Sequence, residues 1–255
     1  MINSELFSIL LAFVSAITAG LIGSFALMKR MTLAGDAVSH IALPGIGIAL
    51  LMHLNPLLGG ATALLIGTLL IWNLEQKTNL ATETAVGVIF SASLAIGALV
   101  TPSAELEEAL FGNFQALSLH NFLIHLLLAV VIIGFLIRYR HQLILALFSP
   151  DLARTAGVRI KWLNLFYLLA FSGTVILGLQ FLGALLMGSL IIIPAAVSRQ
   201  LTHQLKSFLT MSVLVSIVSV GLGFITSSYY GWQLGPTVVT IAAAIFVLSL
   251  LKKKK

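Results

Sequence analysis

Nine apolar runs, each about 20 residues long, follow one another along this chain of 255 residues. A helix needs about 20 apolar residues to cross the hydrocarbon core of a bilayer. The runs therefore predict membrane helices near residues 6–28, 33–53, 57–73, 83–101, 119–137, 162–180, 182–198, 207–227 and 234–251. Two short helices or one broken helix would fit the stretch 163–198.

Charged residues make up only 9% of the chain, whereas about a quarter of a soluble domain is charged. So few charges leave too little polar surface to face water, and most of the surface must face lipid. We therefore expect an all-α fold, a polytopic transmembrane helical bundle of about eight to nine membrane helices. Residues 1–255 should form this single transmembrane domain.

Lysine and arginine all fall on one side of these helices. If the chain crosses at every run, the same set of loops contains all 14 of them, while the opposite loops contain Glu5, Glu105, Glu107 and Glu108. Basic residues are enriched in cytoplasmic loops, so we expect the N-terminus outside, the C-terminus in the cytoplasm and no cleavable signal peptide. The net charge of +6 then indicates contact with lipid headgroups and no nucleic-acid partner.

An acid and an imidazole, Asp36 and His40, lie four residues apart in the second apolar run. On a helix this spacing places both side chains on one face. A charged Asp inside a bilayer costs ~2.5–3.5 kcal/mol on insertion scales, so it should face a partner or a water-filled cavity. Oxygen with imidazole suits Zn²⁺, Mn²⁺ or Fe²⁺, but an Asp–His hydrogen bond that fixes helix packing fits this spacing equally well.

Two ligands are too few for a transition metal, which usually takes four or more. A two-fold homodimer with the second helix at its axis would supply two Asp and two His. Glu83, His125 or Gln180 of the same chain could add ligands instead. Glu83 also suits the positive end of a helix dipole, and His125 also suits a hydrogen bond between packed helices.

Two hydrophilic segments outside the apolar runs offer contacts for other molecules. The acidic segment 105–108 lies where a cation would arrive, and it either attracts the metal, docks a delivery protein or is an ordinary solvated loop. The segment 149–157 predicts a short helix on the inner surface: Ser149 suits the N-cap, Pro150 the first position, Asp151 the dipole and Gly157 the end. That helix is either a connector or a handle for a cytoplasmic protein.

Four stretches of this sequence resemble one known family. "MKRMTLAGDAVSHIALPGIGIA" is similar to the helix-2 signature of permease subunits of ABC-type zinc, manganese and iron uptake transporters, and "LFSPDLARTAGV" resembles their coupling-helix segment. "ATETAVGVIFSASLAIGAL" and "FLGALLMGSLIIIPAAVSRQLT" resemble the fourth-helix region and a later signature. Where the family often has Asp, this chain has Glu83, so the resemblance assigns no role to that residue.

The resemblance implies an ABC importer permease in a bacterial or archaeal cell membrane, with Asp36 and His40 as metal-contacting residues. It also implies a second copy of the chain, a pair of ATPase subunits and an extracellular or periplasmic metal-binding receptor. The residues that would couple to the ATPase are Ser149, Pro150, Asp151, Ala153, Arg154 and Gly157. The transported Zn²⁺, Mn²⁺ or Fe²⁺ would be the substrate, and no permanently bound cofactor is expected.

The missing motifs separate this interpretation from its alternatives. The sequence lacks G-x-x-x-x-G-K-[ST], so a separate ATPase would have to hydrolyse the ATP. It also lacks H-E-x-x-H and G-x-S-x-G, which argues against a membrane enzyme. A gradient-driven secondary transporter or channel, with Asp36 as an ion relay, remains the alternative, and it predicts uptake without any ATPase.

Overall fold

The computed structural model describes residues 2–31, 33–78, 81–101 and 117–251 of the chain. Every regular element in these ranges is a helix, as the apolar runs predict. The helices are α1 (Ile2–Met28), α2 (Ala34–His40), α3 (Leu43–Leu51), α4 (Pro56–Thr78), α5 (Thr82–Val100), α7 (Leu119–Phe148), α8 (Pro150–Thr155), α9 (Ile160–Leu201), α10 (Leu205–Tyr230) and α11 (Leu234–Leu250).

Seven helical segments in the described part of the chain are long and apolar enough to cross a membrane, and the shorter apolar segments Leu186–Leu201 and Leu234–Leu250 accompany them. The prediction of a polytopic α-helical bundle is confirmed. Several helices run past their apolar stretches, most clearly α7, which continues from the predicted end at 137 to Phe148. An apolar run marks only the part of a helix that lies in lipid, and the helix itself can continue into water.

The second apolar run forms two helices rather than one, because α2 ends at His40 and α3 begins at Leu43. Pro44 stands in the first turn of α3. Proline has no N–H, so it cannot donate the bond that a continuous helix would direct at the carbonyl oxygen of His40. A break of this kind is tolerated at membrane depth where the backbone is enclosed by protein.

The stretch 163–198 is one helix interrupted at Gly183, whose φ of 73° and ψ of 173° are not helical. A positive φ is open to glycine at little cost, because glycine has no Cβ. The interruption divides α9 into the apolar segments Ile160–Leu179 and Leu186–Leu201, so of the two arrangements that fit the sequence the structure has the broken helix.

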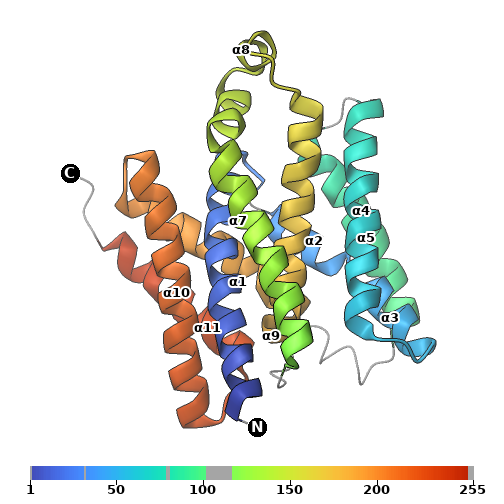
Figure 1. The fold of residues 1–255 in the computed structure, drawn as a ribbon, viewed down its shortest axis with the longest axis vertical. Coiled ribbons are helices and arrows are strands. Elements are labelled where there is room, and N and C mark those ends of the chain that lie inside the picture. The colour runs from blue at the N-terminus through green and yellow to red at the C-terminus, as the bar shows by residue number, and fades with distance from the viewer. Residues whose placement is uncertain (1, 32, 79–80, 102–116, 252–255) are drawn as a thin grey trace.

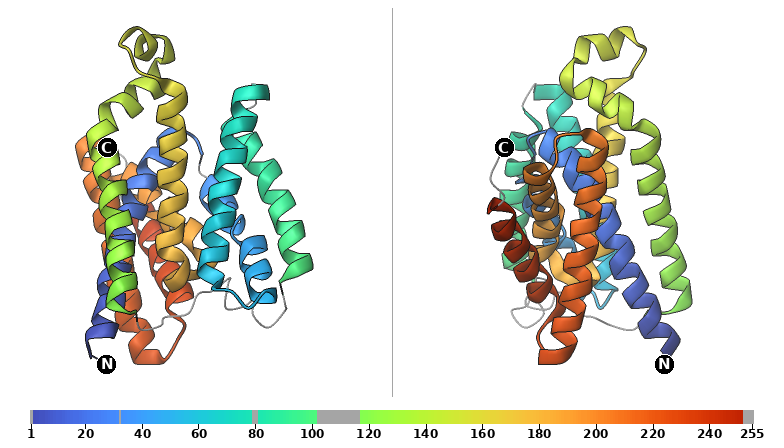
Figure 2. Two further views of the ribbon diagram at one scale, coloured as in Figure 1. Left: turned by 45° about the vertical axis from the view of Figure 1, so that its right-hand side comes forward. Right: turned by 90° about the vertical axis from the view of Figure 1, so that its left-hand side faces the viewer.

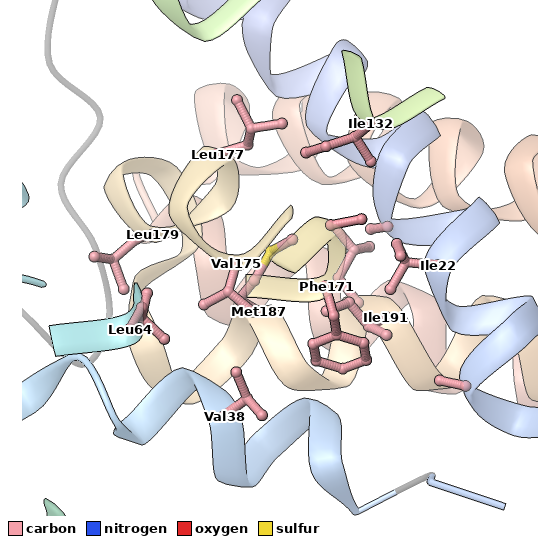
Figure 3. Packing of buried hydrophobic residues seen from close by; sticks show 14 of the residues in the cluster. Ile22, Val38, Leu64, Ile132, Phe171, Val175, Leu177, Leu179, Met187 and Ile191 are labelled. Carbon is pink, nitrogen blue, oxygen red and sulfur yellow. The ribbon is translucent and has the colours of Figure 1, made fainter. Parts of the chain in front are cut away.

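Helix α9 lies at the centre of the bundle and packs against α1, α2, α4, α7, α10 and α11. Figures 1 and 2 show α3, α4 and α5 gathered on one side of it, with α1, α10 and α11 on the other and α8 at one end. In Figure 3, Val38 of α2 points toward Phe171 and Val175 of α9, and all three side chains are buried. The core therefore fixes α2 against the central helix.

Small residues let α1 approach its neighbours closely. A Cβ on Gly23 would lie 1.8 Å from the carbonyl oxygen of Ile191 in α9, and the hydroxyl of Ser212 in α10 donates to the carbonyl of Gly20 at 2.8 Å. Because lipid tails are as apolar as the helices, such close packing and interhelical hydrogen bonds supply much of the association between membrane helices.

Candidate functional site

Asp36 and His40 lie together on α2, as their spacing predicts. The Nε2 atom of His40 is 3.7 Å from the Oδ1 atom of Asp36. The Asp36 side chain is 51% exposed and the His40 side chain only 10% exposed, so the carboxylate reaches open space while the imidazole is held inside the protein. Figure 1 shows α2 at about half the height of the bundle, and the helix belongs to the candidate membrane span Ala34–Leu51.

The His40 ring is held between α2 and α5. Its centre is 5.6 Å from that of the Phe90 ring of α5. Its Nδ1 atom is buried and has no hydrogen-bond partner among the described residues. The neighbouring Ser39 hydroxyl donates to the carbonyl of Gly35 at 2.7 Å, so it is occupied within α2. The imidazole of His40 thus has one ring nitrogen, Nδ1, that forms no hydrogen bond with any described residue.

Two glycines bring α2 against the second half of α9. A Cβ on Gly188 would lie 2.5 Å from both the backbone N and the Cα of Asp36, and one on Gly35 would lie 3.2 Å from the carbonyl oxygen of Gly188. No side chain fits between the two backbones at this point, so α9 fixes the position of the Asp36 backbone. Gly188 belongs to the stretch "FLGALLMGSLIIIPAAVSRQLT", but the sequence alone does not indicate that it touches Asp36.

The structure does not bring Glu83 or His125 to this pair. Glu83 is exposed in the first turn of α5, two turns before Phe90. His125 is buried in α7, where its Nδ1 atom lies 2.7 Å from the carbonyl oxygen of Asn121 in the same helix. No group of three or more His, Asp or Glu side chains suited to a metal ion occurs within the described ranges. The side chain of Gln180 lies outside the described residues.

Helix α8 has the local structure that its sequence predicts. The Ser149 hydroxyl accepts a hydrogen bond from the Leu152 N–H at 3.4 Å, and Pro150 is the first residue of the helix. Gly157 follows the end of the helix with a φ of 79°. The N–H of Gly157 donates to the carbonyl of Arg154 and that of Val158 to the carbonyl of Ala153, a Schellman ending.

Helix α8 has one buried side chain, and its other described side chains are exposed. Ala153 is fully buried, whereas Leu152 is 56% and the preceding Phe148 77% exposed. Asp151 and Arg154 form an exposed pair at 3.3 Å, and such pairs contribute little stability. Figure 1 shows α8 at the far end of the bundle from the start of α1. The acidic segment 105–108 lies outside the described residues.

A polar network that the sequence does not reveal lies near the α8 end of the bundle. Lys29 follows α1, and its ammonium donates to the side-chain oxygen of Asn164 in α9 and lies 4.4 Å from the centre of the Tyr167 ring. The amide of Asn164 in turn donates to Glu75 of α4 at 2.6 Å. Burial lowers the pKa of Lys29 to about 8, and the nearby Glu75 carboxylate opposes that shift.

Comparison with known proteins gives the same picture over nearly the whole chain. The ABC 3 transport family matches residues 1–253. The manganese transport system membrane protein MntC of Listeria monocytogenes is 30% identical over 92% of this chain and 85% of its own length. The high-affinity zinc uptake system membrane protein ZnuB of Haemophilus influenzae is 30% identical over 94% of each chain.

A solved structure supports the same grouping. PsaBC from Streptococcus pneumoniae, determined in complex with a Fab, contains a chain that superposes with a TM-score of 0.81 at 25% identity, covering 98% of this chain and 95% of that one. The family match, the curated relatives and the shared fold each cover more than nine tenths of the chain. This multi-pass membrane protein therefore belongs to the ABC 3 transport family.

Proposed function

We propose that this chain is the membrane permease of an ATP-driven importer that moves Zn²⁺, Mn²⁺ or Fe²⁺ into the cytoplasm. The observation that carries the proposal is the Asp36–His40 pair, held at 3.7 Å on a short helix deep in the bundle. An ionisable residue within a membrane helix is by default a functional candidate. The relatives named for manganese transport and zinc uptake support a divalent transition metal as the cargo.

The chemistry of the pair suits a metal ion in transit. The exposed Asp36 carboxylate offers oxygen and His40 offers nitrogen, a mixed donor set that accepts Zn²⁺, Mn²⁺ and Fe²⁺. Two donors bind an ion weakly, which allows release toward the cytoplasm. A second copy of the chain related by a two-fold axis would double the donor set, so we propose that the permease is a homodimer with the two pairs facing a shared path.

ATP hydrolysis by the ATPase subunits would act on this chain through α8. The exposed Phe148 and Leu152 beside this helix suit the surface of a cytoplasmic ATPase subunit, because exposed apolar side chains outside the membrane favour protein contacts. Ser149, Pro150, Asp151, Ala153, Arg154 and Gly157 shape this contact, either directly or by forming the helix. Movement of α8 passes to α7 and α9, which both pack against it, and α9 in turn contacts the backbone of Asp36.

The direction of transport follows from the proposed orientation. The basic ends of the helices face the cytoplasm, as in other membrane proteins, so the N-terminus lies outside and the C-terminus inside. A metal-binding receptor on the outer face would deliver the ion. The ion would then pass between the helices to Asp36 and His40 and leave on the α8 side.

Uptake of manganese or zinc into sealed vesicles tests the proposal directly. Vesicles that contain the chain with its ATPase subunits and receptor should accumulate metal only when ATP is supplied to the α8 side. Equal accumulation by vesicles that contain the chain alone and are driven by an ion gradient would establish a secondary transporter or channel instead.

A further inference from the structure

A cavity of about 820 Å³ lies at the α8 end of the bundle, and neither the metal pair nor the surface of α8 accounts for it. Its walls come from the ends of α4, α7 and α8, the starts of α5 and α9 and the residue that follows α1. Four cationic side chains line the cavity, those of Lys29, Arg154, Arg159 and Lys161. The carboxylate that lines it belongs to Glu75. The cavity therefore has a surplus of positive charge.

Neighbouring carboxylates in the described part of the chain neutralise this surplus only in part. The Glu75 carboxylate acts on the nearby Lys29, and Arg154 pairs with the exposed Asp151. No ion pair joins Lys29, Arg159 or Lys161 to a described carboxylate. Like charges held close together repel one another, so an anion that enters the cavity would relieve this repulsion.

Tryptophan side chains mark the depth of the cavity in the membrane. Trp162 lines it and is 52% exposed, and its ring centre is 6.0 Å from that of Trp72. The indole N–H of Trp72 donates to the carbonyl of Lys161 at 3.1 Å. Tryptophan gathers at the level of the lipid headgroups. The cavity therefore lies at that level in the leaflet on the α8 side.

Apolar residues complete the wall on the side of α7. Leu143, Ala146 and Leu147 line the same cavity as the basic residues. A ligand with an anionic group at one end and hydrocarbon at the other matches both surfaces. Basic pockets between helices on the cytoplasmic side commonly hold phospholipid headgroups, and the Arg guanidinium is well suited to a phosphate.

We propose that this cavity binds the phosphate headgroup of an anionic phospholipid from the leaflet on the α8 side, which is the cytoplasmic leaflet in the proposed orientation. Lys29, Arg159 and Lys161 contact the phosphate, and the α7 wall contacts the upper part of an acyl chain. The site depends on the position of the chain in the membrane and not on the ion that it transports, so it can be tested without metal.

Native mass spectrometry of the full chain in mild detergent tests the proposal, with phosphatidylglycerol and phosphatidylcholine added in equal amounts. The cavity variant carries Arg159→Gln and Lys161→Gln. The control variant carries Arg199→Gln and Lys206→Gln, which removes the same charge from exposed positions away from the cavity. The wild type and the control should retain phosphatidylglycerol in preference, and the cavity variant should retain it on the order of tenfold less.

Three results would overturn this assignment. Equal retention of phosphatidylglycerol by all three proteins would show that the cavity holds no lipid headgroup, as would retention with no preference over phosphatidylcholine. If inorganic phosphate alone displaces the bound phosphatidylglycerol, the basic residues of the cavity bind a soluble phosphate compound and not a lipid headgroup. Thermal unfolding of the wild type with each lipid provides a second measurement, in which only phosphatidylglycerol should raise Tm.

Discussion

The backbone of Asp36 lies directly against Gly188: a side-chain carbon at Gly188 would fall 2.5 Å from the Asp36 Cα. The acidic residue of the proposed ion path is therefore positioned by the second half of α9, about 150 residues further along the chain. Any movement of this part of α9 would therefore displace the Asp36 backbone.

Replacing Gly188 with alanine should displace α2 and lower metal uptake, because the new methyl group meets backbone atoms that cannot rotate away. Overpacking of this kind costs ~1–3 kcal/mol, so thermal unfolding should shift down as well. Gly134→Ala in α7 is the matched control, since its added carbon meets nothing within 4 Å. Wild-type uptake by Gly188→Ala would show that the close contact does not position Asp36.

Asp36→Ala and His40→Ala should each reduce uptake by about tenfold or more, because each removes a metal-contacting donor. Membrane insertion and assembly with the ATPase should be unchanged, which co-purification can measure.

Glu83→Gln and His125→Gln test the remaining candidates, and we expect both to keep most of the uptake because the structure places them away from the pair. A loss in His125→Gln equal to that in His40→Ala would add His125 to the path.

Gly157→Ala should loosen the link between ATP hydrolysis and transport, because a positive φ strains any residue with a Cβ and the end of α8 would change shape. The number of metal ions moved per ATP should fall while hydrolysis continues. Gly231→Ala is the control: Gly231 has a φ of 68° and open space around it, like Gly157, but it ends α10 at the opposite end of the bundle. Equal loss in both variants would point to general destabilisation.

The stability of the protein should rise with pH above about 8, because Lys29 holds its proton less tightly in the folded state. Burial lowers its pKa from 10.5 to about 8. Between these values the unfolded chain binds more protons than the folded one, and stability rises with pH in that window. Tm measured across it should rise less steeply in Lys29→Met than in the wild type or in Lys206→Met, an exposed control. Parallel curves for all three proteins would exclude Lys29 as the cause.

The absence of cysteine allows a clean test of the orientation. A single cysteine at residue 107 should react with a membrane-impermeant reagent added from outside, and one at residue 154 only after the cytoplasmic side is opened. The basic loops motivate this expectation. The reverse pattern would invert the bundle and with it the direction of transport.

The sequence predicts most of the fold because apolar runs of membrane length determine where helices cross lipid. It also predicts α8, since Ser149, Pro150 and Gly157 act within a few residues of one another. The placement of Asp36 and His40 on one face likewise depends only on helical spacing. These features are local, so a single sequence is enough to reveal them.

Contacts between distant segments could not be predicted in the same way. Lys29 and Asn164 are 135 positions apart, and nothing in the sequence around either residue indicates that the two form a hydrogen bond. The approach of Gly188 to Asp36 depends on the interruption at Gly183, which bends α9 and determines what its second half meets. Helix packing of this kind is set by the whole bundle, and no periodicity in one segment encodes it.

The length of α7 has a mechanical consequence. Its 30 residues span about 45 Å at 1.5 Å per residue, roughly 15 Å more than the hydrocarbon core is thick. The helix therefore extends past the hydrocarbon core on the α8 side, and α8 follows it directly. In the proposed function, an ATPase subunit that moves α8 would move the end of α7 with it, and because α7 is one continuous helix the displacement would reach the part that crosses the membrane.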